Sequence, residues 1–455
     1  MIVRSDVAVI GSGFSAAAVT VNLLDRLPPN LKISLVGNQE NPCRGTAYAT
    51  PSNSHLLNVP AARMGLYPDR PDHFQSWLEE RGMAFGSEDF VPRNLYGAYL
   101  QDVFEEALHR TGNRAAVSRI DARVVGGEAG KDGQQVYRLS DGRTLIAKAS
   151  ALCTGATAAG IPLPKGAIAA EALPHIVEDP WSEPWQQRVP LDGTVLILGT
   201  GLTMVDQCLS LRKRGFVGKI HAISRRGLLP QTHVVPRPAP VEAFLSPGEL
   251  ELSAMLAWLR QRAENAADWR GVIDGLRPVT QDLWKGLTAE QRSRFLRHAA
   301  PFWNSHRHRM APAVSAELGR MRESGDLMID RGRLIGVEPR EGSLRAIFSV
   351  AATGERRSID AHILVNCTGI ERCSVKQSDL LTDMASKGLV RCDPLGLGLD
   401  VDDRSAVVSG DGSVSGRLYA MGAMTLGRFW EITAVPDIRV QAGAVAKSIS
   451  EVLAA

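Results

Sequence analysis

The chain has 455 residues, a hydrophobic fraction of 44% and a formal net charge of +3. A chain of this length exceeds what one hydrophobic core usually supports, so we expect more than one domain. The small net charge gives no sign of a nucleic-acid partner, and the sequence has no uncharged apolar run of about eighteen residues that would indicate a membrane span.

The cysteines and the amino terminus exclude further classes. Six cysteines, at positions 43, 153, 208, 367, 373 and 392, form neither a disulfide framework nor a zinc-ligand spacing, so we expect no metal. No Cys-x-x-Cys pair is present, which disfavours a flavoprotein that exchanges dithiols. Since the first residues lead directly into an apolar strand, we expect no signal peptide and a cytoplasmic location.

The first nucleotide-binding pattern follows this strand. The strand over residues 6–10 is apolar after Asp6 and runs into a Gly-x-Gly turn, after which a helix is predicted over residues 17–27. In this order the glycines let the backbone turn and approach a pyrophosphate, and the helix amino terminus attracts its charge. The residues predicted to bind this first nucleotide are Gly11, Gly13, Phe14, Ser15 and Ala16. A glycine turn kept only for packing is the alternative.

The next strand leaves the ribose contact open. Residues 31–36 form the strand whose end lies beside the ribose in this kind of fold, and an acidic residue commonly stands there. Here the strand runs into Gly37 and Asn38, and the first acid is Glu40. Both Asn38 and Glu40 are therefore candidates for the ribose contact.

Two later apolar strands, at residues 151–153 and 363–367, both end in Thr-Gly. Strands of this kind connect the nucleotide domains of flavoproteins that bind two dinucleotides, and the glycine lets the backbone pass close to a cofactor. The predicted cofactor contacts are Thr154, Gly155, Thr368 and Gly369. The alternative is a buried parallel strand that ends in glycine without a ligand.

A second fingerprint lies between these two strands. The apolar run 194–198 leads into a Gly-x-Gly turn and a predicted helix over 205–214, in the same order as at the amino terminus. Its predicted binding residues are Gly199, Gly201, Leu202 and Thr203. Met204 is an irregular substitute for the small third residue of the motif. Two such patterns in matching contexts indicate that one chain binds two nucleotides.

The residues after the following strand indicate which nucleotide binds there. The strand 219–223 is followed at once by Ser224, Arg225 and Arg226, where the adenosine ribose lies. An NAD site places an acid at this point, whereas a serine and two arginines suit the additional phosphate of NADP. We therefore predict NADPH, with two solvated arginines at a strand end as the alternative.

Residues from about 236 to 312 are predicted to form a helical insertion in the second nucleotide domain. A helix start is expected at 246–249, and helices are expected over 250–262, 269–284 and 288–300. Four of the eight tryptophans lie between positions 258 and 303, and core packing is the simplest role for them.

The end of the insertion carries an alternating basic segment. His306 and His308 have no acidic or thiol partner at a ligand spacing, so we predict no metal site. Arg307 and Arg309 are candidates to bind a substrate carboxylate or the NADPH phosphates through their planar donors. A basic surface turn is the alternative.

The last eighty residues are predicted to return to the first domain. Residues 417–422 form the final strand, and Gly422 is expected to meet the cofactor. Pro436 then opens a helix, because proline is favoured in the first turn and Asp437 suits its positive end. A helix amino terminus beside the flavin would stabilise the negative charge of its reduced form. Capping alone also explains both residues.

Several motifs together resemble a known family. They are Arg44-Gly-Thr-Ala-Tyr48, His55-Leu-Leu-Asn-Val-Pro-Ala61, Val91-Pro-Arg-Asn-Leu-Tyr96, the second fingerprint through Asp206, and Trp430-Glu-Ile-Thr-Ala-Val-Pro-Asp-Ile-Arg439. With these motifs, the sequence resembles, over nearly its whole length, a family of bacterial FAD/NAD(P)-binding oxidoreductases. That family is related to class B flavin monooxygenases and to the ornithine and lysine N-hydroxylases. Its members with assigned chemistry look like amino-group N-oxygenases, including enzymes that oxidise the nitrogen of aspartate.

The resemblance implies further site residues. Additional cofactor contacts are implied at Tyr48, Leu57, Asn58, Met64 and Ile438. Arg63 and Arg93, which lie in family motifs, are candidate binders of a substrate carboxylate or of the pyrophosphate.

The expected fold is α/β, with two Rossmann-like domains that bind FAD and NADPH. We expect residues 1–190 to begin the FAD domain, residues 191–335 to form the NADPH domain with its insertion, and residues 336–455 to complete the FAD domain. The expected activity is N-oxygenation of a small amino acid or amine, with aspartate first, through a flavin hydroperoxide formed from dioxygen. One alternative is an NADPH-dependent flavin reductase, oxidase or electron-transfer protein. Another is a sensor or structural module that binds FAD without turnover, against which the intact second fingerprint with Arg225 and Arg226 argues. The oligomeric state stays open.

Overall fold

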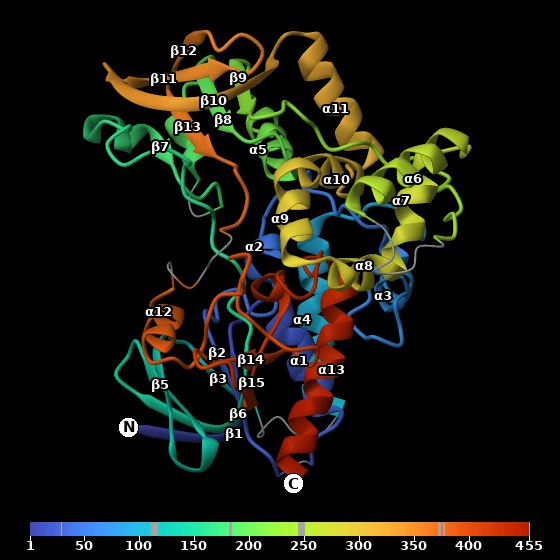
Figure 1. The fold of residues 1–455 in the computed structure, drawn as a ribbon, viewed down its shortest axis with the longest axis vertical. Coiled ribbons are helices and arrows are strands. Elements are labelled where there is room, and N and C mark those ends of the chain that lie inside the picture. Colours follow the sequence, from blue (N-terminus) through green and yellow to red (C-terminus); the bar gives the residue numbers. More distant parts are fainter. Residues whose placement is uncertain are drawn as a thin grey trace.

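The computed structural model describes residues 1–28, 30–110, 117–181, 184–243, 251–371, 375 and 378–454. Two sheets, each with its own helices, form two α/β domains that lie one above the other in Figure 1. The expected α/β fold with two Rossmann-like domains is therefore confirmed. A group of helices lies beside the junction between the domains (Figure 1).

The first domain is built on an eight-stranded sheet. Its main path follows the order β14-β15-β6-β1-β2-β3, with β1 parallel to both β2 and β6. Its strands are β1 (Ile2–Ile10), β2 (Ile33–Val36), β3 (Val117–Ile120), β4 (Val124–Ala129), β5 (Gln135–Leu139), β6 (Thr144–Leu152), β14 (Ala406–Val408) and β15 (Val414–Ala420). The inner end of β1 is buried on both faces, which explains its unbroken apolar run.

Helices cover the first sheet and lead chain segments to its carboxyl edge. The α-helices are α1 (Phe14–Leu24), α2 (Gly45–Tyr48), α3 (His73–Glu80), α4 (Arg93–Arg110), α12 (Asp379–Ser386) and α13 (Val435–Ala454). The 3₁₀ turns are η1 (Ala61–Arg63), η2 (Lys131–Gly133) and η7 (Gly422–Thr425). Helix α1 buries Ala16, Ala17 and Ala18, whose short side chains let it pack closely against α13.

The second domain contains a seven-stranded sheet in the order β12-β11-β10-β9-β8-β13-β7. Its strands are β7 (Ile176–Val177), β8 (Thr194–Leu198), β9 (Lys219–Ser224), β10 (Leu327–Arg340), β11 (Ser343–Val350), β12 (Arg356–Ala361) and β13 (Ile363–Asn366). Helices α5 (Leu202–Lys213) and α11 (Pro312–Glu323) pack on it, and the turns η3 (Ala170–His175) and η4 (Trp185–Arg188) precede β8. This sheet runs past the boundary expected at residue 335, because the β10–β12 hairpins extend it before β13 returns to pair with β8.

The helical insertion comprises α6 (Leu252–Asn265), α7 (Trp269–Leu276), η5 (Arg277–Val279), α8 (Thr280–Gly286), α9 (Ala289–His298) and α10 (Ala300–Arg307). The helix expected over 269–284 is interrupted at Pro278, because proline cannot continue the hydrogen-bond ladder. The start expected at 246–249 lies outside the described residues. Trp284 is 3% exposed and stacks on Trp430, with 4.6 Å between ring centroids, so core packing is confirmed for this tryptophan.

Two segments that connect the domains are hydrogen-bonded to each other. The amide of Ala159 donates to the carbonyl of Gly369 at 3.0 Å, and the amide of Glu371 donates to the carbonyl of Thr157 at 2.8 Å. These segments follow β6 and β13, the two strands that end in Thr-Gly. The paired connections place the carboxyl edges of both sheets toward the junction of the domains.

Candidate dinucleotide sites

The first glycine of each fingerprint is required by the packing of neighbouring strands. Gly11 has φ +129°, and a Cβ there would overlap the carbonyl of Cys153 at the end of β6. Gly199 has φ +101° and would meet the carbonyl of Cys367 in the same way. Each Gly-x-Gly turn therefore lies under the end of a Thr-Gly strand, which brings the two predicted halves of each site together.

The helices that follow these turns present free donors. Helix α1 has Gly13 and α5 has Gly201 as N-cap, and within the described chain neither helix receives a side-chain cap. The unpaired N–H groups and the helix dipole suit a phosphate. A Cβ built on Gly201 would meet no described atom within 4 Å, so open space lies beside the second turn. Both turns therefore fit a dinucleotide pyrophosphate.

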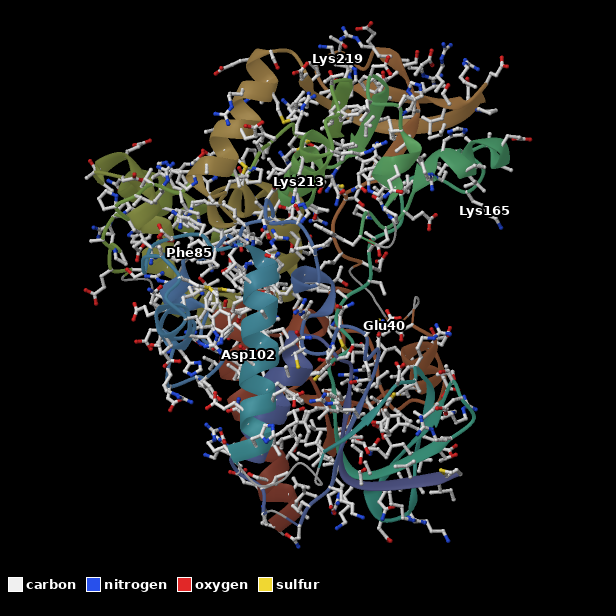
Figure 2. The ribbon with its side chains drawn as sticks, turned by 180° about the vertical axis from the view of Figure 1, so that it is seen from behind. Glu40, Phe85, Asp102, Lys165, Lys213 and Lys219 are labelled. Carbon is white, nitrogen blue, oxygen red and sulfur yellow. The ribbon has the colours of Figure 1, made fainter. Side chains whose placement is uncertain are left out.

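The first fingerprint opens into a large cleft between the domains, with a volume of about 920 Å³. On the first domain it is lined by Ser12, Asn38 and Thr46, and on the second by Gln207 and Lys213. Of the two ribose candidates, Asn38 lines this cleft and accepts the backbone N–H of Glu40 at 2.8 Å. The exposed Glu40 lies near the domain boundary in Figure 2, but it is not among the residues that line the cleft.

The expected flavin end lies where β15 meets α13. Gly422 has φ +68°, and a Cβ there would lie 2.8 Å from Ser15 Oγ and 4.0 Å from the side chain of Ile438. The amide of Gly422 donates to Gln441 Oε1 at 2.8 Å, and Gln441 Nε2 donates to the hydroxyl of Thr425. The predicted residues Ser15, Gly422 and Ile438 thus meet at one point. Sequence reasoning missed Gln441, because a buried glutamine inside a helix carries no motif.

The residues implied by the family resemblance lie deeper in the first domain. Leu57 and Met64 are 4% and 2% exposed, and burial raises the pKa of Tyr48 to about 12. The carbonyl of Asn58 lies 3.1 Å from Nε2 of His233 in the second domain, and the hydroxyl of Thr154 donates to the sulfur of Met424. Their contacts with a cofactor stay predictions.

The second fingerprint opens into a smaller cleft of about 380 Å³. All seven residues that the sequence predicts for the second nucleotide line it: Gly199, Gly201, Leu202, Thr203, Ser224, Arg225 and Arg226. Thr368 and Gly369, which the sequence predicts to contact a cofactor, line it as well. Helix α10 forms the opposite wall through Pro301, Asn304, Ser305 and His308. The insertion therefore closes one side of this cleft.

The two arginines of this cleft have different partners. Arg226 lies with its guanidinium carbon 4.9 Å from the ring centre of Phe302, and it donates to the carbonyls of Arg297 and His298. Arg225 is exposed on the cleft wall. Arg225 is therefore the better placed of the two for an additional phosphate, while Arg226 joins the insertion to the cleft.

Three of the four candidate substrate arginines form internal ion pairs. Arg93 lies 2.9 Å from Asp206, Arg307 lies 2.9 Å from Glu431, and the guanidinium of Arg309 pairs with Asp274. Arg309 is only 3% exposed. These pairs give the three arginines structural roles.

Arg63 lies elsewhere, in a pocket beside the start of α13. This pocket is also lined by Arg277, which sequence reasoning missed because an isolated arginine beside Pro278 forms no motif. Pro436, which the sequence predicts to open the helix at the flavin, lies in the same pocket, and α13 begins one residue earlier, at Val435.

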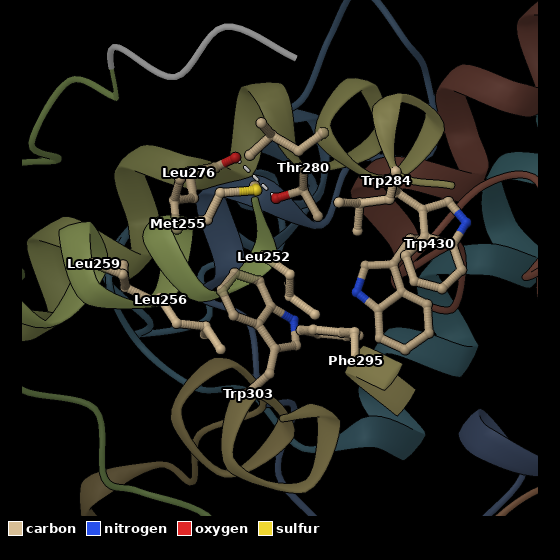
Figure 3. A pocket seen from close by; sticks show the side chains of 12 residues that line it. Leu252, Met255, Leu256, Leu259, Leu276, Thr280, Trp284, Phe295, Trp303 and Trp430 are labelled. Atoms are coloured by element: carbon tan, nitrogen blue, oxygen red, sulfur yellow. Dashed lines mark hydrogen bonds between the residues drawn. The ribbon is translucent and has the colours of Figure 1, made fainter. Parts of the chain in front are cut away.

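A further apolar pocket lies inside the insertion (Figure 3). It is lined by leucines of α6 together with Trp284, Phe295, Trp303 and Trp430. Its volume is about 90 Å³, and the stacked indoles identify it as an imperfectly filled part of the insertion core.

No group of histidine, cysteine or acidic side chains among the described residues is arranged to hold a metal ion. His306 instead packs against Trp269, with 4.8 Å between ring centroids. The four cysteines described as free thiols are all buried: Cys43, Cys153, Cys208 and Cys367. None of the described helices combines the length and the apolar character needed to cross a membrane.

A family model described as FAD-NAD(P)-binding matches residues 8–157. Residues 8–157 therefore match an FAD-NAD(P)-binding domain. The match covers β1, the first fingerprint and β6 up to its Thr-Gly end, so a flavin and a nicotinamide dinucleotide as cofactors agree with both clefts. Which nucleotide occupies each cleft stays a prediction.

A relative of known name is the nitrosuccinic acid synthase npaA of Aspergillus oryzae, 27% identical over 159 residues. The match covers 31% of this chain and only 24% of that protein's length. Among solved structures, the ornithine N-hydroxylase of Kutzneria sp. 744 is similar with a TM-score of 0.67 at 17% identity, over 98% of this chain and 99% of that one. The ornithine hydroxylase PvdA of Pseudomonas aeruginosa is similar with a TM-score of 0.64 at 16% identity, over 99% and 100%. The fold is thus shared along nearly the whole chain.

Proposed function

We propose that the protein is an FAD-dependent, NADPH-consuming monooxygenase that oxygenates the amino nitrogen of a small amino acid or amine. The observation that carries this proposal is the pair of clefts in one chain. The first cleft is lined by Ser12 of the first fingerprint turn, and the second by the whole second fingerprint turn together with Thr368 and Gly369. A second nucleotide cleft with an exposed arginine at the ribose position favours a protein that consumes NADPH. A module that binds FAD without turnover would have no need of a second nucleotide cleft.

The protein residues supply binding, orientation and shielding. The uncapped amino termini of α1 and α5 bind pyrophosphates, and Arg225 donates to the additional phosphate. The amino terminus of α13, beside Gly422, stabilises negative charge at the flavin end. The insertion closes one side of the second cleft and would keep water from it. When bound, FAD supplies the transfer of reducing equivalents from NADPH to dioxygen.

The named relatives support an amine nitrogen as the site of oxygenation. Two structures of the same fold are ornithine hydroxylases, and the relative that matches the first domain is a nitrosuccinic acid synthase. Nitrosuccinic acid has the carbon skeleton of aspartate, so L-aspartate is the first substrate to test. L-ornithine is the second.

The test separates nucleotide choice from oxygen chemistry. The FAD-loaded protein is reduced anaerobically by NADPH or by NADH, while the flavin absorbance is recorded. We expect faster reduction by NADPH, and we expect Arg225→Gln to weaken NADPH binding about tenfold or more while the NADH reaction is unchanged. Arg322→Gln, which removes an exposed arginine of α11 outside the cleft, is the matched control. Equal reaction with both nucleotides in all three proteins would reject NADPH as the preferred donor.

The reduced protein is then mixed with aerated buffer and L-aspartate or L-ornithine. Formation of a product that is one oxygen atom heavier than the amine, detected by mass spectrometry, supports the monooxygenase. Hydrogen peroxide equal to the NADPH consumed, with either amine present, would instead favour a flavin reductase or oxidase.

A further inference from the structure

A pocket lined by arginines lies between the insertion and the first domain. Its volume is about 830 Å³, and η1, the turn from η5 to α8, and the start of α13 form its walls. Arg63, Arg277 and Arg439 line it, and we call it the basic pocket. Pro436 and Gln441 line the same pocket, which places it beside the expected flavin end.

Positive charge exceeds negative charge around this pocket. Three carboxylates lie close enough to interact with the buried charges in and beside the pocket: Asp274, Glu431 and Asp437. Six arginines surround them: Arg63, Arg237, Arg277, Arg307, Arg309 and Arg439. Asp282 and Asp403 also line the pocket. Asp282 is exposed, and Asp403 already pairs with two cations, Lys285 and Arg428, so positive charge still exceeds negative charge.

The ion pairs divide these charges unevenly. Asp274 forms ion pairs with both Arg309 and Arg237. Nη2 of Arg237 lies 2.8 Å from Oδ2 of Asp274. Glu431 accepts from Arg307 at 2.9 Å and from the indole of Trp303 at 2.5 Å. Both of these carboxylates therefore have their partners already.

Arg277 is left with a poor partner. Its Nη2 lies 3.7 Å from Asp437 Oδ2, which is beyond hydrogen-bond distance, and neither atom has a hydrogen bond to any described residue. The side chains are only 20% and 23% exposed. Burial raises the pKa of Asp437 above its ordinary value, although Arg277 opposes this effect. A loose pair of this kind leaves a buried guanidinium donor free.

Arg439 adds a second free donor. It is 8% exposed, and its Nη1 donates to the carbonyls of Arg63 and Gly65 at 3.0 Å. Its Nε is buried and has no partner among the described residues. Buried charged donors without partners are costly, so an anion that enters the pocket would gain contacts that the described residues do not provide.

We propose that the basic pocket binds a carboxylate of the substrate, with Arg277 as the main donor. This inference rests on the proposed function and narrows it to amines that carry a carboxylate. Arg277 presents a planar guanidinium, which matches the two oxygens of a carboxylate. The pocket holds the substrate by its acidic end beside the flavin end, so diamines without a carboxylate are excluded.

The test measures binding without turnover. Succinate carries two carboxylates and no amine, so it binds without being N-oxygenated. Binding of succinate and of 1,4-diaminobutane to the oxidised, FAD-loaded protein is measured by calorimetry. We expect succinate to bind and the diamine not to bind. Arg277→Gln should weaken succinate binding about ten- to a hundredfold, and Arg277→Lys should weaken it less.

Arg294→Gln, which removes an exposed arginine of α9, is the matched control and should leave succinate binding unchanged. Equal succinate binding in the wild type and in Arg277→Gln would overturn the proposal. Loss of FAD from Arg277→Gln would also overturn it, because the pocket would then belong to the cofactor. Succinate binding without oxygenation of any amine would reject the proposed function and leave the carboxylate site standing.

Discussion

Arg93 of the first domain and Asp206 of the second form an ion pair of 2.9 Å across the domain junction. Both side chains are largely buried, at 15% and 7% exposure, and Arg93 also donates to the carbonyl of Leu56. His55 contacts the same helix, with Nε2 at 2.8 Å from Ser210 Oγ. These contacts fix α5, which follows the second fingerprint, against the segment that precedes α4.

The Arg93–Asp206 pair makes domain stability dependent on pH. Burial raises the pKa of Asp206 to about 6, although Arg93 lowers it, so removal of Arg93 raises this pKa further. At pH 8 the variant Arg93→Met must bury an uncompensated carboxylate or protonate it, and we expect a loss of about 3 kcal/mol in unfolding free energy. At pH 5 Asp206 is mostly protonated in both proteins, so the loss should be much smaller.

Urea unfolding at the two pH values measures this difference. Arg345→Met removes an exposed pair with Asp360 and should cost about 1 kcal/mol or less. A loss for Arg93→Met that is the same at pH 5 and pH 8 would show that the Asp206 charge is not the cause.

His55 gives a pH dependence of opposite sign. Burial, with a contribution from Arg93, lowers its pKa to about 4, below the ordinary value of 6.5. The unfolded chain then binds the proton more strongly, so this group costs stability as the pH falls from 6.5 to 4 and has no effect above 6.5. In the wild type this group lowers the unfolding free energy at acid pH. We expect His55→Gln to remove up to about 3 kcal/mol of that decrease. Unfolding curves at pH 7.5 and 4.5 test it, with the exposed His298→Gln as control. If the unfolding free energy fell by the same amount between pH 7.5 and pH 4.5 in His55→Gln and in the wild type, His55 would not be the cause.

The two glycines of the second fingerprint should respond differently to alanine. Gly199 has a positive φ and faces the carbonyl of Cys367, so Gly199→Ala should destabilise the second domain. Gly201 has φ −84° and open space beside it, so Gly201→Ala should fold normally. The added methyl would still occupy the space expected for the pyrophosphate, and NADPH should bind about tenfold more weakly.

Thermal unfolding and NADPH titration of the FAD-loaded variants distinguish these effects. Both variants should retain FAD, because the first fingerprint is intact. If Gly201→Ala bound NADPH as tightly as the wild type, the second cleft would not hold the pyrophosphate at this turn.

The sequence predicted the nucleotide turns well because their requirements are local. A strand that ends in Gly-x-Gly before a helix can form in few ways, and β8 was predicted with its observed bounds of 194 and 198. The assignment of Ser224, Arg225 and Arg226 to the second cleft also depended only on their place after β9.

Contacts between distant segments could not be predicted in this way. The domain boundary was placed too early, because β11 and β12 join the second sheet by hairpin pairing that leaves no fingerprint. The partners of Arg93, Arg307 and Arg309 come from helices and loops far away in the chain, so the sequence indicates arginines available to a ligand where the structure has ion pairs. Arg277 was missed because its importance comes from the charges that surround it.

Helix α10 connects the second nucleotide cleft with Glu431. Asn304 and His308, four residues apart, line the cleft on one face, and Trp303 and Arg307, also four residues apart, hold Glu431 on another. Glu431 is 7% exposed and adopts φ +68°, which is unusual for a residue with a side chain. Glu431→Gln would leave Arg307 without its anion, so we expect a loss of about 3 kcal/mol in unfolding free energy and several-fold weaker NADP⁺ binding through a shift of α10.

Chemical unfolding and NADP⁺ titration measure the two effects separately, and the exposed Glu290→Gln on α9 is the control. A loss of stability with unchanged NADP⁺ affinity would show that Glu431 holds the insertion in place without setting the cleft. Weaker NADP⁺ binding in Glu431→Gln but not in Glu290→Gln would mean that a shift at Glu431, before α13, is transmitted through α10 to the second cleft. The flavin end and the second nucleotide cleft would then be structurally coupled.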